Sequence, residues 1–222
     1  MDASASASGG LAGAYLEKVT AFVTRTGPDG TRMLMIQHPT AGVQFPAGTV
    51  DEGEEIEHAA FRETFEECGI SIDQLRLVQL IGQRDEFPPG ATNTILHRTT
   101  VYALPNPNSF DWAYLPRGAA IQFLRKQNGY AQVTYQEGDR FPDPRYTSYQ
   151  ITGWVPESAL AVANRRYFYH LAFTGDTPER WSQNADYHTF ELFWAPLSDL
   201  PRIVPFQRSW YDHVTGPLGY RF

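Results

Sequence analysis

Acidic residues crowd a short stretch of this chain between Gly48 and Ile70. Three of them, Glu63, Glu66 and Glu67, stand three and four positions apart, so on a helix their side chains share one face. Like charges at that spacing repel each other by about a few tenths of a kcal/mol per pair. A hard divalent cation offsets such repulsion, because Mg²⁺ binds through few carboxylates and takes other ligands from water and substrate phosphates. The spacing therefore indicates either a metal-binding helix face or an ordinary solvated one.

The segment 54–68 must position these carboxylates, and it is predicted as a helix. It contains no Pro or Gly, and Gly69 follows it as a C-terminal cap. At about 100° per residue, Phe61, Phe65 and Cys68 fall on the side away from the carboxylates. The pattern predicts one carboxylate face and one aromatic face packed on the core.

Short apolar runs separated by turn residues predict strands before and after this helix. The predicted strands are 14–23, 33–38, 43–45, 75–83, 94–104, a hairpin over 121–135 that turns at Asn128-Gly129, 167–173 and 189–194, with a short helix near 207–213. Residues 1–12 are expected to be a flexible tail, and 13–222 one domain. Roughly 106–162 is expected to be an insertion into that domain, because the texture changes to Pro- and Gly-bounded segments there.

Composition excludes several classes of protein. With 222 residues, 42% of them apolar, the chain can bury the core of one generous domain. No apolar run approaches the roughly 20 residues that span a bilayer, so no membrane contact is expected. A net charge of −7 argues against gripping a nucleic acid polymer. Cys68 is the single cysteine and the N-terminus lacks a secretory signal, so a reducing cytoplasm is the default location.

The acidic stretch also matches a longer pattern, G-x5-E-x7-R-E-U-x-E-E-x-G-U, in which U is a bulky apolar residue. The matching residues are Gly48, Glu54, Arg62, Glu63, Glu66, Glu67, Gly69 and Ile70. This spacing resembles the box of the Nudix (MutT-like) hydrolases. Thr64 departs from the pattern at the first apolar position, where its β-branched side chain can still pack.

The resemblance covers roughly 13–105 and 163–215, and it implies an α/β fold. The expected architecture is a Nudix-type α/β/α sandwich around a mixed β-sheet, with an inserted hairpin-containing segment. Members of the family hydrolyse a nucleoside diphosphate linked to another group X, which makes a small nucleotide the expected partner and Mg²⁺ the expected cofactor, with Mn²⁺ left open. An insertion in this family shapes either the substrate pocket or the interface of a homodimer.

The resemblance also implies roles for individual residues. The metal ligands would be Glu63, Glu66, Glu67 and the carbonyl oxygen of Gly48. Arg62 would orient a glutamate through a salt bridge, and Glu54 would join that supporting network.

The general base is left open by the resemblance. Glu67 is the first candidate within the box, and Glu191 is the best candidate from a later strand. Glu137 and Asp139, in the insertion, are more remote candidates.

Two questions about function stay open at this point. Pro88-Pro89 falls near a Pro of ADP-ribose pyrophosphatases, which hints at an ADP-ribose-like substrate, although a Pro pair also marks an ordinary turn. A Nudix module that binds a nucleotide without turnover is the main alternative, but such members lose box glutamates, and none is lost here. An isoprenoid isomerase on the same fold would need extra catalytic Cys and Glu residues outside the box, and the only cysteine is Cys68.

Overall fold

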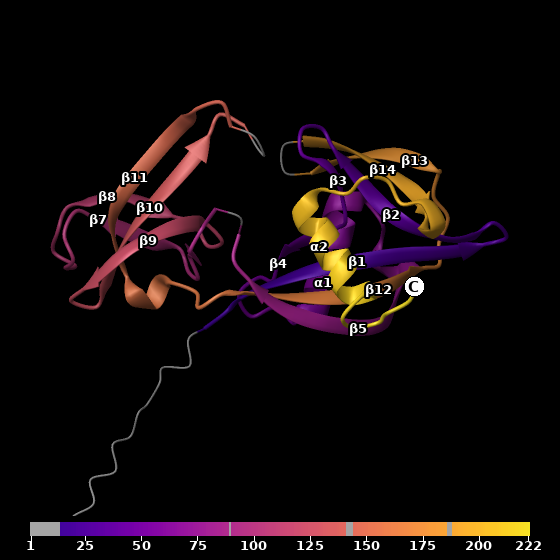
Figure 1. Ribbon diagram of the computed structural model, residues 1–222, viewed down its shortest axis with the longest axis horizontal. Helices are drawn as coiled ribbons and strands as arrows, with labels where there is room; N and C mark the ends of the chain where they lie inside the picture. Colours follow the sequence, from indigo (N-terminus) through magenta and orange to yellow (C-terminus); the bar gives the residue numbers. More distant parts are fainter. Residues whose placement is uncertain (1–13, 89, 141–143, 186–187) are drawn as a thin grey trace, which may run out of the picture.

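The computed structural model describes residues 14–88, 90–140, 144–185 and 188–222. The expected tail at 1–12 and Pro89 lie outside the described residues. The chain forms two lobes, each built on its own β-sheet (Figure 1). One lobe carries both long helices, and the other consists of strands, turns and a short 3₁₀ helix.

In the described part of the chain, eight strands form the main sheet, in the order β13-β14-β2-β1-β12-β5, with β3 beside β2 and β4 beside β1. Their bounds are β1 Leu16–Gly27, β2 Gly30–His38, β3 Gly42–Gln44, β4 Ala47–Thr49, β5 Leu75–Glu86, β12 Asn164–Phe173, β13 Arg180–Ala185 and β14 His188–Pro196. The central pair, β1 and β12, is parallel, whereas β1 is antiparallel to β2 and β12 is antiparallel to β5. The sheet is therefore mixed, as predicted.

Two helices cover the two faces of the main sheet: α1 (Ile56–Cys68) and α2 (Pro205–Thr215). Successive residues of a strand point to opposite faces, and β1 is apolar on both. Val19 and Val23 join the core beneath α1, while Phe22 joins the core beneath α2. This two-sided burial confirms the α/β/α sandwich. No helix in the described ranges is long and apolar enough to cross a membrane.

The second sheet is antiparallel, in the order β6-β9-β10-β11-β7-β8. Its strands are β6 Asn93–Thr94, β7 Thr99–Tyr102, β8 Asp111–Leu115, β9 Ala120–Gln127, β10 Tyr130–Gly138 and β11 Thr147–Pro156; short 3₁₀ helices elsewhere span Ile72–Gln74, Glu157–Ala159 and Leu197–Asp199. The predicted hairpin turn is present between β9 and β10. Asn128 and Gly129 adopt φ of 52° and 77° there, the left-handed region that this turn requires.

The prediction of a single strand over 94–104 is wrong. β5 pairs with β12 instead of with this segment, and the chain crosses after β5 into the second lobe. The apolar residues of the segment pack into two different cores, and the sequence pattern does not show which residue belongs to which core. Ile95 is buried in the second-sheet core, whereas Leu96 packs with Leu16 and Ala161 at the junction of the lobes.

Candidate metal and hydrolysis site

The helix that carries the acidic residues packs closely on the main sheet. Its buried residues include Ala59, Ala60 and Cys68, whose small side chains let the helix approach the strands. The helix ends at Gly69, which has φ of 70° and donates its N–H to the Phe65 carbonyl at 2.8 Å. The predicted C-terminal cap is confirmed.

The predicted aromatic face is wrong for one of its members. Phe61 packs partly against the core, but Phe65 is 49% exposed. The buried side of the helix is turned toward the small residues, so Phe65 is carried to its solvent edge. Thr64 is instead fully buried, and its Oγ1 donates to the Ala60 carbonyl at 2.8 Å. It packs where the pattern has a bulky apolar residue.

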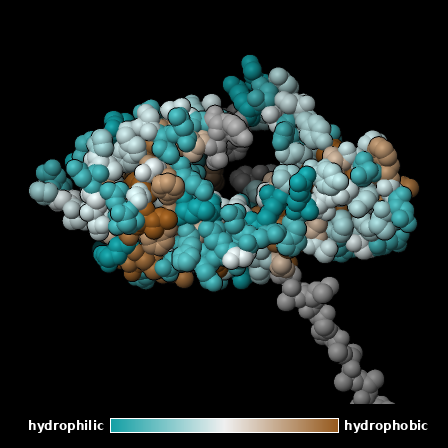
Figure 2. Space-filling model, turned by 180° about the vertical axis from the view of Figure 1, so that it is seen from behind, coloured by the Kyte–Doolittle hydropathy of each residue, from teal (hydrophilic) through white to brown (hydrophobic). Residues whose placement is uncertain are grey.

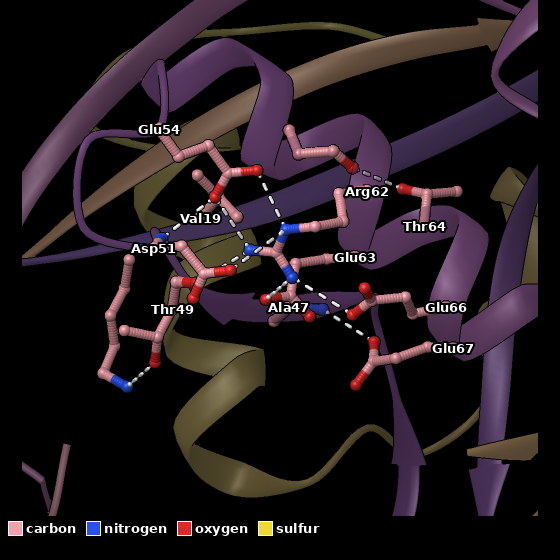
Figure 3. A network of polar contacts seen from close by, with 12 residues as sticks. Val19, Ala47, Thr49, Asp51, Glu54, Arg62, Glu63, Thr64, Glu66 and Glu67 are labelled. Carbon is pink, nitrogen blue, oxygen red and sulfur yellow. Dashed lines mark hydrogen bonds and ion pairs between the residues drawn. The ribbon is translucent and has the colours of Figure 1, made fainter. Parts of the chain in front are cut away.

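Arg62 is the centre of the polar network on this helix (Figure 3). Its Nε and Nη2 donate to the two carboxylate oxygens of Glu54 at 2.8 and 2.9 Å. Its Nη1 donates to Glu63 at 3.0 Å and to Glu66 at 3.1 Å. The bidentate bond to Arg62 is the main cause that lowers the pKa of Glu54. One guanidinium thus hydrogen-bonds to three carboxylates and has a fourth, Asp51, at 3.9 Å. The salt bridge implied for Arg62 is present.

Thr49 fixes Arg62 from the other side. Its carbonyl accepts a hydrogen bond from Arg62 Nη2 at 2.9 Å, while its Oγ1 accepts one from Lys18 Nζ at 2.8 Å. Thr49, the last residue of β4, therefore contacts two cations on separate elements.

Glu63 is pressed against the backbone of β4. A Cβ added at Gly48 would lie only 1.9 Å from Glu63 Cδ, so glycine alone leaves space for this carboxylate. Burial raises the pKa of Glu63, and the neighbouring charge of Arg62 opposes that shift. Glu67 also reaches β4, where its Oε2 accepts the Ala47 N–H at 3.0 Å.

The chemistry of these donors fits a hard divalent cation. Glu63, Glu66, Glu67 and the Gly48 carbonyl offer oxygen atoms alone, the ligand type of Mg²⁺, and the glycine brings Glu63 next to the backbone. Within the described residues, no three acidic, His or Cys side chains are already gathered around one point, since Arg62 lies between Glu63 and Glu66. The residues suit the ion by type and position. Without the ion, the positive charge of Arg62 balances the negative charge of Glu63 and Glu66.

The later candidates for the general base lie elsewhere. Glu191, on β14, is exposed and accepts a hydrogen bond from Ser182 Oγ at 2.7 Å. Its neighbours on the strand, Phe190 and Leu192, belong to the core beneath α1, so Glu191 points to the opposite face of the sheet. Its role stays a prediction.

The two candidates from the insertion are engaged within the second lobe. Glu137 accepts a hydrogen bond from the Tyr135 hydroxyl. Asp139 forms an ion pair with Arg145 at 2.9 Å.

Sequence reasoning missed the basic residues on the central strands. Lys18 lies on β1, and Arg166 lies on β12 with a side chain only 8% exposed. Each precedes the buried apolar run of its strand, and a long cation beside such a run is the signal that could have singled them out.

The comparisons with known proteins bear on this geometry. A family profile described as NUDIX domain matches residues 16–119, a range that includes β1, the glycine at Gly48 and the whole of α1. Residues 16–119 thus match the Nudix domain family. A comparison with curated proteins gave no match.

Several solved structures are similar to this chain in overall path. A C. elegans Ap4A hydrolase in a binary complex is 13% identical, with a TM-score of 0.44 over 91% of this chain and 99% of that one. The NUDIX domain of Shewanella oneidensis NrtR complexed with ADP ribose is 16% identical, with a TM-score of 0.38 over 91% and 90%. A putative NUDIX hydrolase of Listeria monocytogenes is 13% identical, with a TM-score of 0.35 over 80% and 75%. At these values the three structures say nothing about what this chain binds or hydrolyses.

Proposed function

We propose that this Nudix domain hydrolyses the pyrophosphate bond of a nucleoside diphosphate linked to a second group, with Mg²⁺ or Mn²⁺ as cofactor. The observation that carries the proposal is the set of three box carboxylates on α1, with Glu63 against Gly48 and Arg62 paired with Glu54, which precedes the helix. An ADP-ribose-like compound is the first substrate to test.

In this proposal Glu63, Glu66 and Glu67, with the Gly48 carbonyl, hold the cation. When bound, the cation neutralises the diphosphate oxygens and lowers the pKa of a bound water. Glu67 accepts a proton from the attacking water, whose oxygen forms a new bond to phosphorus as the bridging P–O bond breaks. The products are a nucleotide and the phosphorylated second group. Arg62 acts through the carboxylates that it positions rather than on the substrate.

The first experiment is a coupled phosphate-release assay over ADP-ribose, dinucleoside polyphosphates, nucleotide sugars, coenzyme A and nucleoside triphosphates. Each compound is tested with Mg²⁺, with Mn²⁺ and with EDTA. Glu67→Gln is expected to lower kcat by about 10²–10⁴-fold, the usual contribution of a general base. Glu57→Gln is the matched control, because Glu57 is an exposed glutamate in the first turn of the same helix.

The variant Glu191→Gln separates the two candidates for the base. A loss of kcat in Glu191→Gln, with Glu67→Gln still active, would move the base to β14. Absence of metal-dependent turnover for every compound, together with measurable nucleotide binding, would replace the proposal with a nucleotide-sensing Nudix module.

A further inference from the structure

A cavity of about 460 Å³ lies where the two lobes meet, and Figure 2 shows the molecule hollowed between them. The main sheet contributes Lys18, Arg84 and Asn164 to its wall, and α2 contributes Trp210. The second lobe contributes the segment 118–120. Ligand pockets in proteins have about 300–1,000 Å³, so the cavity is large enough for a nucleotide-sized molecule.

Positive charge dominates the wall of this inter-sheet cavity. Lys18, Arg84 and Arg166 all line it, and among the described lining residues Glu86 is the one acidic residue beside them. Arg166 is fixed in place: its Nε donates to Glu86 at 2.7 Å, and its guanidinium stacks over the Trp210 ring at 3.8 Å. Glu86 also lies 3.6 Å from an Arg84 nitrogen, so this one carboxylate is shared by two arginines. Three cations against one carboxylate leave an excess of positive charge for a guest.

Lys18 supplies the cation nearest to the box. Its Nζ donates to Thr49 Oγ1, a neutral acceptor. Burial and the neighbouring charges of Arg166 and Arg117 lower the pKa of Lys18 to about 8. An anion in the cavity would relieve both effects, because it would replace lost hydration and offset the repulsion between the cations.

Polar atoms without partners mark the same place. Asn164 is 2% exposed and lines the cavity, yet its buried Oδ1 has no hydrogen-bond partner among the described residues. The Nε of Arg117, next to the lining residue Gly118, is also buried and has no partner in the described part of the chain. Buried polar atoms are nearly always satisfied, so an acceptor and a donor left open here point to a polar guest.

We propose that the inter-sheet cavity binds the phosphate-bearing half of the substrate, with Lys18 and Arg84 holding the phosphate and Asn164 accepting a hydrogen bond from the attached sugar or base. That the ligand is a substrate rests on the proposed function, whereas its binding in the cavity does not. Thr49 connects the cavity to the box, because its Oγ1 contacts Lys18 and its carbonyl contacts Arg62. Phe87, which also lines the cavity, offers an apolar surface to the same ligand.

The test is isothermal titration calorimetry of AMP, ribose 5-phosphate and adenosine in EDTA, so that binding is measured without metal. AMP and ribose 5-phosphate are expected to bind, and adenosine at least tenfold more weakly. Lys18→Met is expected to raise the Kd of AMP at least tenfold, since charge-assisted hydrogen bonds are lost. Lys126→Met is the matched control, because Lys126 is the other lysine of the chain and pairs with Glu157 on the second lobe.

A second variant, Arg84→Gln, covers the case in which Lys18→Met does not fold, because the Arg84 side chain is 34% exposed. The proposal fails if wild type binds no AMP at millimolar concentration. It also fails if the Kd in both cavity variants equals that in Lys126→Met.

One further variant separates this proposal from the hydrolase proposal. Glu66→Gln is expected to keep AMP binding in EDTA while metal-dependent turnover is lost. Binding of AMP by a wild type that hydrolyses nothing would support the cavity and reject the hydrolase. Turnover with an unchanged KM in the cavity variants would support the hydrolase and reject the cavity as the binding site.

Discussion

The surroundings of Arg62 and the inter-sheet cavity have opposite charge patterns. Around Arg62, one guanidinium is shared by Glu54, Glu63 and Glu66. In the cavity, one carboxylate, Glu86, stands among three cations. The first place leaves negative charge for a cation, and the second leaves positive charge for an anion.

The difference shows how the fold places complementary sites side by side. Thr49 contacts both, so a ligand that bridges them meets carboxylates at one end and ammonium and guanidinium groups at the other. A metal–diphosphate complex has that polarity. Arg62 balances the carboxylates of the box, and Glu86 balances the cations of the cavity. These two residues are therefore the first to mutate.

The largest effect on stability is expected at Glu86. Glu86→Gln removes the charge that faces Arg166, and breaking a buried ion pair costs about 3 kcal/mol of unfolding free energy. Urea denaturation measures it. Glu157→Gln, which breaks the exposed pair with Lys126, is the control and should cost less than about 0.5 kcal/mol. Equal losses in the two variants would contradict the comparison.

Arg62→Met makes the mirror change. Three carboxylates lose their shared cation, and Glu54 and Glu63 are mostly shielded from solvent. Unpaired buried polar groups cost about 1–3 kcal/mol each, so a loss of about 2 kcal/mol is expected at neutral pH. Because the pKa of Glu54 is lowered by Arg62, the contribution of this pair is present above the ordinary carboxyl pKa and disappears as the pH falls. A difference from wild type that persists in acid would count against this account.

Gly48→Ala tests the seat of Glu63. The new Cβ would overlap the Glu63 carboxylate, and overpacking of this kind costs about 1–3 kcal/mol. Metal-dependent turnover should fall about a hundredfold, because the carboxylate must leave β4. Gly27→Ala is the control, since a Cβ there meets nothing within 4 Å. Full activity of Gly48→Ala would show that the contact is dispensable.

The charge of Lys18 should make AMP binding depend on pH. Its pKa of about 8 means that the side chain loses its proton as the pH rises through that value. The affinity for AMP in EDTA is expected to fall about tenfold between about pH 7 and about pH 9. Lys18→Arg keeps its charge over this range and should give a flat profile. The same slope in both proteins would remove Lys18 from the explanation.

The smallest effect is expected at Phe65. Its side chain is half exposed, so Phe65→Ala should change the free energy of unfolding by no more than about 0.5 kcal/mol. Phe61→Ala, on the partly buried side of the same helix, should cost more. Thermal unfolding of the two variants decides between the helix orientation in the structure and the aromatic face predicted from the sequence.

The helix and its carboxylates were predictable because their information is local. The interval from Gly48 to Ile70 contains the spacing, the cap and the partners of Arg62. The cavity was not, because Lys18, Arg84 and Asn164 are far apart in the sequence and meet only through strand pairing. The spacing of about 100° per residue misplaced Phe65 because it locates the polar face of the helix. It does not determine which of the remaining residues contact the sheet.

The parallel pairing of β1 with β12 has a consequence for how the chain acquires its structure. Leu16 pairs with Asn164, so the central pair of the main sheet joins segments from opposite parts of the sequence. By contrast, the three strands β9, β10 and β11 pair with strands that are consecutive in the sequence. Distant pairings pay a larger loop-closure entropy and form more slowly. During synthesis the second sheet can therefore assemble first, whereas β1, which bears Lys18, can pair with β12 only after β12 has been synthesised.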